Sequence, residues 1–153
     1  PLRMAGYMIG LNAHGIPLRE ELVARVDGDG SAEAGRLAVR GLLDRGAKFT
    51  AVFVDTDTKA VGALQALREA GLRVPQDVSV LGYDDMPGAD RLDPPLTTIR
   101  SPNFELGVEA VKLLERRFER HGADVEGVML ATRLVARQSC APRPPEHAPQ
   151  AAT

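Results

Sequence analysis

Two pairs of aspartates have the residue types and the spacing to do chemistry. Asp84 and Asp85 come directly after the apolar run VSVLGY (78–83), and Asp55 and Asp57 follow another apolar run, AVFV. Carboxylates paired in this way can hold Mg²⁺, can supply a nucleophile with its acid partner, or can accept hydrogen bonds from the hydroxyls of a ligand. The residue types alone leave all three chemistries open.

The segments around these aspartates alternate between strand and helix patterns. Residues 50–55 and 78–84 are continuous apolar runs with β-branched residues, which is typical of strands buried on both faces of a sheet. Between them, an apolar stripe at helical spacing ends at Gly71, a residue suited to closing a helix. This order predicts an α/β fold with a parallel sheet built from βαβ units. Because parallel strands end at one edge, the aspartates should line a ligand-binding rim.

The remaining elements follow from the same patterns. Ser31 is a candidate N-cap for a helix that ends at Gly46, and its expected apolar stripe consists of Leu37, Ala38, Leu42 and Leu43. The other expected elements are a helix at 2–13, a short strand at 22–28, a strand at 96–101, a long helix at about 103–120 and a strand or strand pair at 127–139. Residues 141–153 are rich in proline and poor in large apolar residues, which predicts a disordered tail.

Composition and charge argue against several functional classes. The 153 residues are 44% hydrophobic and 26% charged with a net charge of −2, which is typical of a globular chain that does not grip nucleic acid by itself. Cys140 is the single cysteine, so neither a disulfide framework nor a cysteine metal site is expected, and a reducing cytoplasm is indicated. No apolar run has transmembrane length, and the three histidines are far apart, so we expect neither a membrane partner nor a bound metal.

The spacing of Asp55 and Asp57 resembles the opening motif of haloacid-dehalogenase phosphatases, in which a strand delivers a nucleophilic aspartate and its acid partner. The resemblance stops there, because Thr58 and Lys59 stand where that family has a glycine–threonine turn. A phosphoacceptor receiver domain is a poorer match, because the lysine that it needs at its last strand has no counterpart. The phosphatase stays open as an alternative.

A binding role asks less of these residues. An aspartate accepts hydrogen bonds from two hydroxyls of a sugar or nucleoside-like ring, and an arginine donates from the other side in a fixed fork. We place Arg3, Asp57, Asp84 and Arg100 at such a site. The alternative for Asp84 is a carboxylate that caps nearby loop amides.

Residues 51–102 resemble the lactose/galactose repressor family of bacterial transcription regulators. The match is dense in AVGAL, in GLRVPQDVSVLGYDD and in PPLTTIR, and it extends more weakly to RMAGY (3–7) and RLVARQS (133–139). A run of this length is more specific than any of its short motifs. The resemblance covers nearly the whole chain apart from the tail.

This resemblance implies a periplasmic-binding-protein-like effector domain, in which two α/β lobes joined by three crossovers hold a small molecule between them. Residues 1–140 would be the C-terminal portion of that domain: the C-terminal lobe at 1–101, a helix of the other lobe at 102–126 and a returning strand at 127–140. The N-terminal lobe and a helix-turn-helix domain that binds DNA would then lie outside this chain. The resemblance further implies a homodimer that is not an enzyme and needs no cofactor.

On the same resemblance, five residues contact or border the effector, which is expected to be a sugar or a related small molecule. Arg3 opens the R-x-x-G-Y motif and Asp84 is the first aspartate of G-Y-D-D, so both should grip the hydroxyls of the ligand. Thr56 and Asp57 stand where the family usually has Asn-Asp, and Ser101 stands at the pocket edge.

The neighbouring Asp85 is expected to turn away from the ligand and cap backbone amides. Two substitutions leave the identity of the effector open: Gly30 replaces an aromatic residue that stacks on the ligand in several family members, and Thr56 replaces the usual asparagine. A single lobe should bind the effector weakly or not at all.

The long helix at 103–120 carries an apolar stripe that would lose its partner without the other lobe. We expect this stripe to pack against a second copy of the chain or to fold back on its own sheet. A periplasmic sugar-binding protein of a transporter has the same fold and is the second functional alternative.

Overall fold

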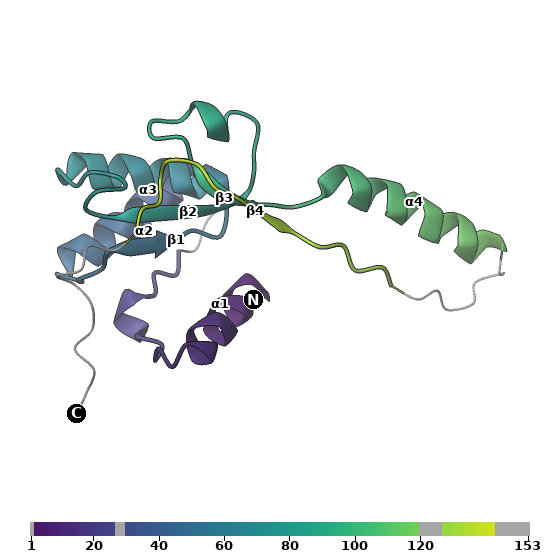
Figure 1. The fold of residues 1–153 in the computed structure, drawn as a ribbon, viewed down its shortest axis with the longest axis horizontal. Coiled ribbons are helices and arrows are strands. Elements are labelled where there is room, and N and C mark those ends of the chain that lie inside the picture. Colours follow the sequence, from purple (N-terminus) through teal and green to yellow (C-terminus); the bar gives the residue numbers. More distant parts are fainter. Residues whose placement is uncertain (1, 27–29, 120–126, 143–153) are drawn as a thin grey trace.

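The elements of the chain are seen in a computed structural model that describes residues 2–26, 30–119 and 127–142 (Figure 1). In chain order they are α1 (Leu2–Ala13), the 3₁₀ helix η1 (Glu20–Leu22), α2 (Ala32–Asp44), β1 (Ala51–Phe53), α3 (Asp57–Glu69), β2 (Ser79–Asp84), the 3₁₀ helix η2 (Ala89–Arg91), β3 (Thr97–Arg100), α4 (Asn103–Glu119) and β4 (Arg133–Val135).

The strands form a sheet in the order β1-β2-β3-β4. β1, β2 and β3 run parallel, with Phe53 opposite Leu81 and Asp84 opposite Arg100, and β4 runs antiparallel to β3. The first three strands therefore end at one edge, as the βαβ alternation predicts. The α/β fold class with a sheet dominated by parallel strands is confirmed.

Local signals begin and end the two helices that flank β1. The Ser31 hydroxyl caps α2 by accepting a hydrogen bond from the Ala34 amide at 3.2 Å, and the Thr56 hydroxyl caps α3 by accepting one from the Lys59 amide at 3.3 Å. Gly71 follows α3 with a φ of 73°, a conformation that glycine adopts without steric cost. The expected cap of α2 is correct, and Thr56 caps α3.

The hydrophobic core lies between α3 and one face of the sheet. Its members are Val39, Val54, Ala60, Ala63, Leu64, Ala66, Leu67, Val78, Val80, Ala89 and Leu96, all buried. α2 packs against the outer side of α3 through two glycines, since a Cβ built on Gly35 would lie 2.0 Å from the Lys59 carbonyl oxygen and one on Gly62 would lie 1.7 Å from that of Ala32. This backbone contact allows the two helices to approach closely.

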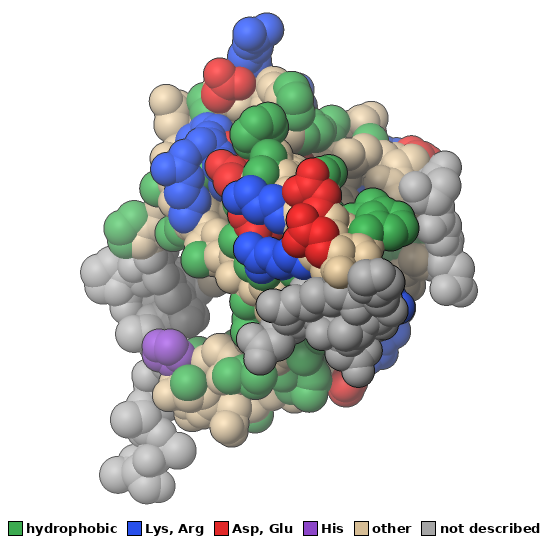
Figure 2. Space-filling view, turned by 90° about the vertical axis from the view of Figure 1, so that its right-hand side faces the viewer, with side chains coloured by type: hydrophobic (Ala, Val, Ile, Leu, Met, Phe, Trp, Pro, Cys, Tyr) green, Lys and Arg blue, Asp and Glu red, His purple; other side chains and the backbone are tan. Residues whose placement is uncertain are grey.

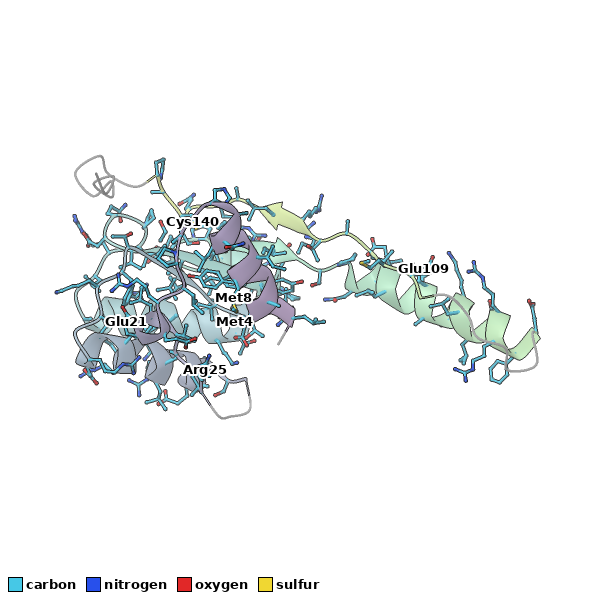
Figure 3. The ribbon with its side chains drawn as sticks, turned by 90° about the horizontal axis from the view of Figure 1, so that it is seen from below. Met4, Met8, Glu21, Arg25, Glu109 and Cys140 are labelled. Atoms are coloured by element: carbon cyan, nitrogen blue, oxygen red, sulfur yellow. The ribbon has the colours of Figure 1, made fainter. Side chains whose placement is uncertain are left out.

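The opposite face of the sheet carries α1. Residues alternate between the two faces of a strand, so Tyr83 and the register partners Phe53 and Leu81 point away from α3. The Tyr7 ring of α1 stacks on Phe53 with the ring centroids 6.0 Å apart. Figure 3 shows α1 lying across the sheet on this side.

α4 extends away from the rest of the molecule (Figures 1 and 3). None of its residues is buried, and Phe104 and Phe118 are 80% and 72% exposed. The expected helix is confirmed, but the expectation that its apolar stripe folds back on its own sheet is wrong. The alternative partner, a second copy, stays a prediction.

Three local expectations differ from the structure. Residues 23–26 form no strand, because among the described residues β1 has a ladder partner only on its β2 side, and the rest of the expected 22–28 strand includes residues outside the described part. Leu37 is 51% exposed, since Ala34, Gly35, Val39 and Leu42 form the buried face of α2. The strand expected at 127–139 is reduced to β4, and residues 143–153 of the expected tail lie outside the described residues.

The contact between α2 and α3 leads to a test with a control on the same helix. Gly35→Ala is expected to lower the free energy of unfolding by about 1–3 kcal/mol, because the new methyl group would overlap the Lys59 carbonyl and push α2 off α3. Gly41→Ala places its methyl group 3.5 Å from the Arg45 guanidinium and should raise stability by up to about 1 kcal/mol through helix propensity. Thermal and urea unfolding followed by circular dichroism measure both; equal effects would contradict the close packing.

Candidate functional site

Arg3 and Asp84 meet at the carboxyl edge of the sheet. The Arg3 Nη2 atom donates to Asp84 Oδ1 at 3.1 Å, and its Nη1 atom donates to the Asp55 carbonyl oxygen. The guanidinium carbon lies 4.0 Å from the centroid of the Tyr83 ring, which is the geometry of a cation–π contact. The structure thus brings together the two residues expected to grip a ligand, one from α1 and one from the end of β2.

Asp84 is held in an unfavourable setting. Its φ is 110° and that of Asp85 is 56°, and both values lie in the positive region that residues other than glycine rarely adopt. Burial raises the pKa of Asp84, the Arg3 charge opposes this rise, and the charges of Asp57 and Asp55 add to it. Its side chain is still one-third exposed, so the carboxylate is constrained and partly desolvated but open to a ligand.

Asp85 does not cap backbone amides, contrary to expectation. Its side chain is 6% exposed and accepts hydrogen bonds from Arg100 and from Arg137, the latter at 2.6 Å. Burial would raise the pKa of Asp85, but the hydrogen bonds from Arg137 and Arg100 outweigh it and hold the pKa below its ordinary value. Arg100, which we placed at the ligand, is therefore engaged by Asp85.

Asp57 lies behind the site and not at its surface. The residue is 1% exposed, and its oxygens accept hydrogen bonds from the Thr98 hydroxyl at 2.6 Å and the Met86 amide at 2.9 Å. A Cβ on Gly82 would lie 2.2 Å from Asp57 Oδ1, so only glycine fits at that position. This placement gives Asp57 a supporting role. It also removes the acid partner that the phosphatase alternative needs beside Asp55.

The structure places Thr56 and Ser101 at the same edge as Asp84 but does not join them to it. The Thr56 hydroxyl is engaged as the cap of α3. Ser101 directly follows β3 and is half-buried. No hydrogen bond links either hydroxyl to Arg3 or Asp84 within the part of the chain that the structure describes.

Comparison with known proteins places this geometry in a family. Residues 1–140 match the family described as "Periplasmic binding protein-like domain". The ribose operon repressor of Haemophilus influenzae is 39% identical over 137 residues, and the transcriptional repressor PurR of Yersinia pestis is 39% identical over 142 residues. The chain belongs to the lactose/galactose repressor family. The resemblance stated from the sequence is confirmed.

The match covers most of this chain but less than half of either of these two relatives. It takes in 90% of the chain and 41% of the ribose operon repressor, and 93% of the chain and 41% of PurR. The chain therefore spans about two fifths of the length of the curated relatives it matches.

Solved structures of the family have the same fold. A complex of the transcriptional regulator CelR with cellobiose has a TM-score of 0.83 at 38% identity, and the match covers 90% of this chain and 41% of that one. A lactose-repressor-family regulator from Enterococcus faecium with bound ribose has a TM-score of 0.81 at 34% identity, covering 93% and 52% of the two chains. These family members establish the periplasmic-binding-protein-like fold of the chain.

The segment that returns after β4 carries two residues whose roles sequence reasoning missed. Ser139, fully buried, accepts a hydrogen bond from the Thr97 amide at 2.7 Å and donates one to the Val80 carbonyl at 2.6 Å. Arg137 donates to the Leu96 carbonyl as well as to Asp85. The signal was present as polar residues in the RLVARQS motif, which this family shares, but the motif alone does not name their partners.

The described residues contain no group of three or more His, Cys, Asp or Glu side chains that could hold a metal ion. No helix among them is long and apolar enough to cross a membrane.

The neighbouring aspartates should affect stability in opposite directions at pH 7. Asp85→Asn is expected to lower the free energy of unfolding by about 2–4 kcal/mol, because it leaves Arg137 partly buried without its carboxylate. Asp84→Asn is expected to raise it, because the raised pKa of Asp84 means that ionisation of this carboxyl opposes folding. Urea unfolding at pH 7 measures both variants.

The pH dependence gives the second half of this test. The stabilisation by Asp85 is fully present above the ordinary aspartate pKa of about 3.9 and is lost as the pH falls towards its lower folded value. The cost of Asp84 is present above its raised pKa and is relieved below it. The gap in stability between the two variants should therefore begin to narrow above about pH 4, as the cost of Asp84 is relieved, and should narrow further below about 4, as the stabilisation by Asp85 is lost; a gap independent of pH would contradict these assignments.

Proposed function

We propose that this chain is the effector-binding part of a bacterial transcription regulator that acts in the cytoplasm. The effector is a sugar or a related small molecule, and Arg3 and Asp84 bind its hydroxyls. Effector binding alters the affinity of a separate helix-turn-helix domain for operator DNA. The chain itself carries out no catalysis and needs no metal or cofactor.

The observation that carries this proposal is the Arg3–Asp84 pair. A guanidinium donor and a carboxylate acceptor 3.1 Å apart offer complementary partners to neighbouring hydroxyls of one ring. Arg3 rests on the Tyr83 ring and on the Asp55 carbonyl, so its planar group is oriented before any ligand arrives. Such preorganisation lowers the entropy lost on binding. Thr56 and Ser101, on the same edge, are proposed to border the pocket.

The known relatives support the same assignment. The solved relatives include regulators bound to cellobiose and to ribose. The named curated relatives are repressors and a regulator, which favours a regulator over the transport-protein alternative. On the face that Figure 2 shows, acidic and basic side chains lie next to one another and not in a patch of one sign, which suits DNA contact through another domain.

A second lobe would complete the site. We propose that residues 1–101 form the C-terminal lobe, that the segment 102–126 belongs to the other lobe and that 127–140 returns from it. Binding energy controls DNA affinity only if it differs between two arrangements of the lobes. The isolated 153-residue chain is therefore expected to bind the effector weakly or not at all.

The ligand grip is tested in the full-length protein that carries this chain. Isothermal titration calorimetry with ribose, cellobiose and adenosine, which all carry neighbouring ring hydroxyls, should identify a ligand, and Arg3→Ala and Asp84→Asn should each weaken its binding by roughly 10–100-fold, the loss expected for a hydrogen bond to a charged group. The effector should also change operator affinity in a gel-shift assay, and neither variant should respond at the concentration that affects the wild type.

Asp77→Asn is the matched control for this test. Asp77 is also paired with an arginine, Arg73, at 2.8 Å, but it lies before β2, at the other end of the strand from Asp84. Its replacement should leave ligand affinity unchanged. Wild-type affinity in Arg3→Ala and Asp84→Asn would refute the proposed grip.

We also propose that, in the absence of the other lobe, α4 pairs with a second copy of the 153-residue chain. Phe104, Val108, Val111, Leu114 and Phe118 expose an apolar stripe, and such a surface favours association. We expect the 153-residue chain to self-associate in sedimentation velocity runs, and Val111→Asp to shift it towards monomer. Arg116→Asp introduces the same residue on the polar side of the helix and should leave association unchanged. A wild-type chain that is monomeric at tens of micromolar would contradict this role of α4.

A further inference from the structure

Asp85 joins two segments that lie far apart in the sequence. Arg100 is the last residue of β3, from which the chain runs to α4, and Arg137 lies two residues beyond β4, on the chain that returns from α4. Both guanidinium groups donate to the Asp85 carboxylate, one to each oxygen. We call Asp85, Arg100 and Arg137 the Asp85 clamp.

The Asp85 clamp holds the bend that carries Asp84. Residues 84 and 85 both have positive φ, and conformations of this kind persist only where the surrounding structure enforces them. Here the bend is held from two sides, by the arginines on Asp85 and by Asp57, which accepts the Met86 amide at 2.9 Å. Asp84 is therefore presented by its neighbours and not by its own conformational preference.

The clamp also keeps the Arg100 guanidinium, which would compete with a ligand for Asp84, bound to Asp85. Arg100 is the register partner of Asp84 on the adjacent strand, and neighbouring strands are only about 4.8 Å apart. The Arg100 side chain is 41% exposed and is longer than this spacing. Without Asp85, Arg100 could turn to the Asp84 carboxylate and occupy the oxygens that a ligand needs.

We propose that Asp85 is a positioning residue for effector binding, which keeps Arg100 off Asp84 and fixes the bend that presents Asp84 beside Arg3. This inference rests on the proposed function of the Arg3–Asp84 pair and extends it to residues that touch no ligand. Arg137 anchors the other oxygen of the carboxylate and is itself fixed by the Leu96 carbonyl at 2.7 Å. Through Asp85, the proposed ligand-binding residue Asp84 is thereby linked to both chain segments that connect the sheet with α4.

Rescue by a second substitution separates positioning from mere stability. In the full-length protein, Asp85→Asn should weaken binding of the ligand found among ribose, cellobiose and adenosine by roughly 10–100-fold, as for loss of a hydrogen bond to a charged group. Asp85→Asn combined with Arg100→Gln should recover part of that affinity, because the competing cation is gone although the bend is still released. Arg100→Gln alone should bind nearly as the wild type does, since Arg137 still holds Asp85.

A purely structural role of Asp85 predicts the opposite order. The double variant would then bind no better than Asp85→Asn, since it removes one more partner of the clamp. That result, or wild-type affinity in Asp85→Asn, would overturn the inference while leaving the proposed function intact. Asp77→Asn, which breaks a more exposed Asp–Arg pair outside the site, is the control for loss of an ion pair elsewhere in the chain.

Amide hydrogen exchange tests the clamp without any ligand. In the 153-residue chain, Asp85→Asn should speed exchange in the segment 84–88, including the Met86 amide, whereas Asp77→Asn should affect only the segment near 73–79. Unchanged exchange at 84–88 in Asp85→Asn would overturn the inference. A further outcome is that the full-length wild type binds none of the three probes although Asp85→Asn speeds exchange at 84–88 as expected. In that case the proposed ligand class is wrong, and the role of the Asp85 clamp in holding the bend is supported.

Discussion

The buried carboxylate of Asp57 holds together the edge of the sheet at which we propose that the ligand binds. It sits in the first turn of α3, where the positive end of the helix dipole favours a negative charge. From there it accepts hydrogen bonds from Thr98 on β3 and from the Met86 amide after β2, and it lies against Gly82. A buried charge is costly unless it is hydrogen-bonded, so these segments are held together where the strands end.

This anchor explains how the chain tolerates an unfavourable residue at the site. Asp84 has a positive φ and a raised pKa, and both features oppose folding. Its neighbours Asp57 and Asp85 have favourable partners on either side, so the strain is local and the surrounding structure enforces it. The arrangement is expected where binding, and not stability, determines the residue.

Sequence reasoning succeeded where the signal is local. The apolar run of β2, the Ser31 cap and the glycine after α3 each act within a few residues, so the βαβ units could be predicted from them. The meeting of Arg3 with Asp84, which are 81 residues apart, was predicted from the family resemblance and not from local signals. The partners of Asp85 could not be predicted, because Arg100 and Arg137 are 15 and 52 residues away along the chain. The strand expected at 22–28 failed for a related reason: a strand requires a ladder partner, and its own residues do not supply one.

The Asp85 clamp binds both chain segments that connect the sheet with α4. The chain leaves the sheet at Arg100 and returns to it through β4 and Arg137, so both ends of the excursion to α4 are bound to one carboxylate. That carboxylate is adjacent in sequence to the residue that we propose binds the effector. A ligand that binds Asp84 therefore contacts the bend at residues 84 and 85, and Asp85 links this bend to both connecting segments. If α4 packs on another lobe, a ligand that contacts Asp84 more favourably in one arrangement of the lobes than in another will favour that arrangement.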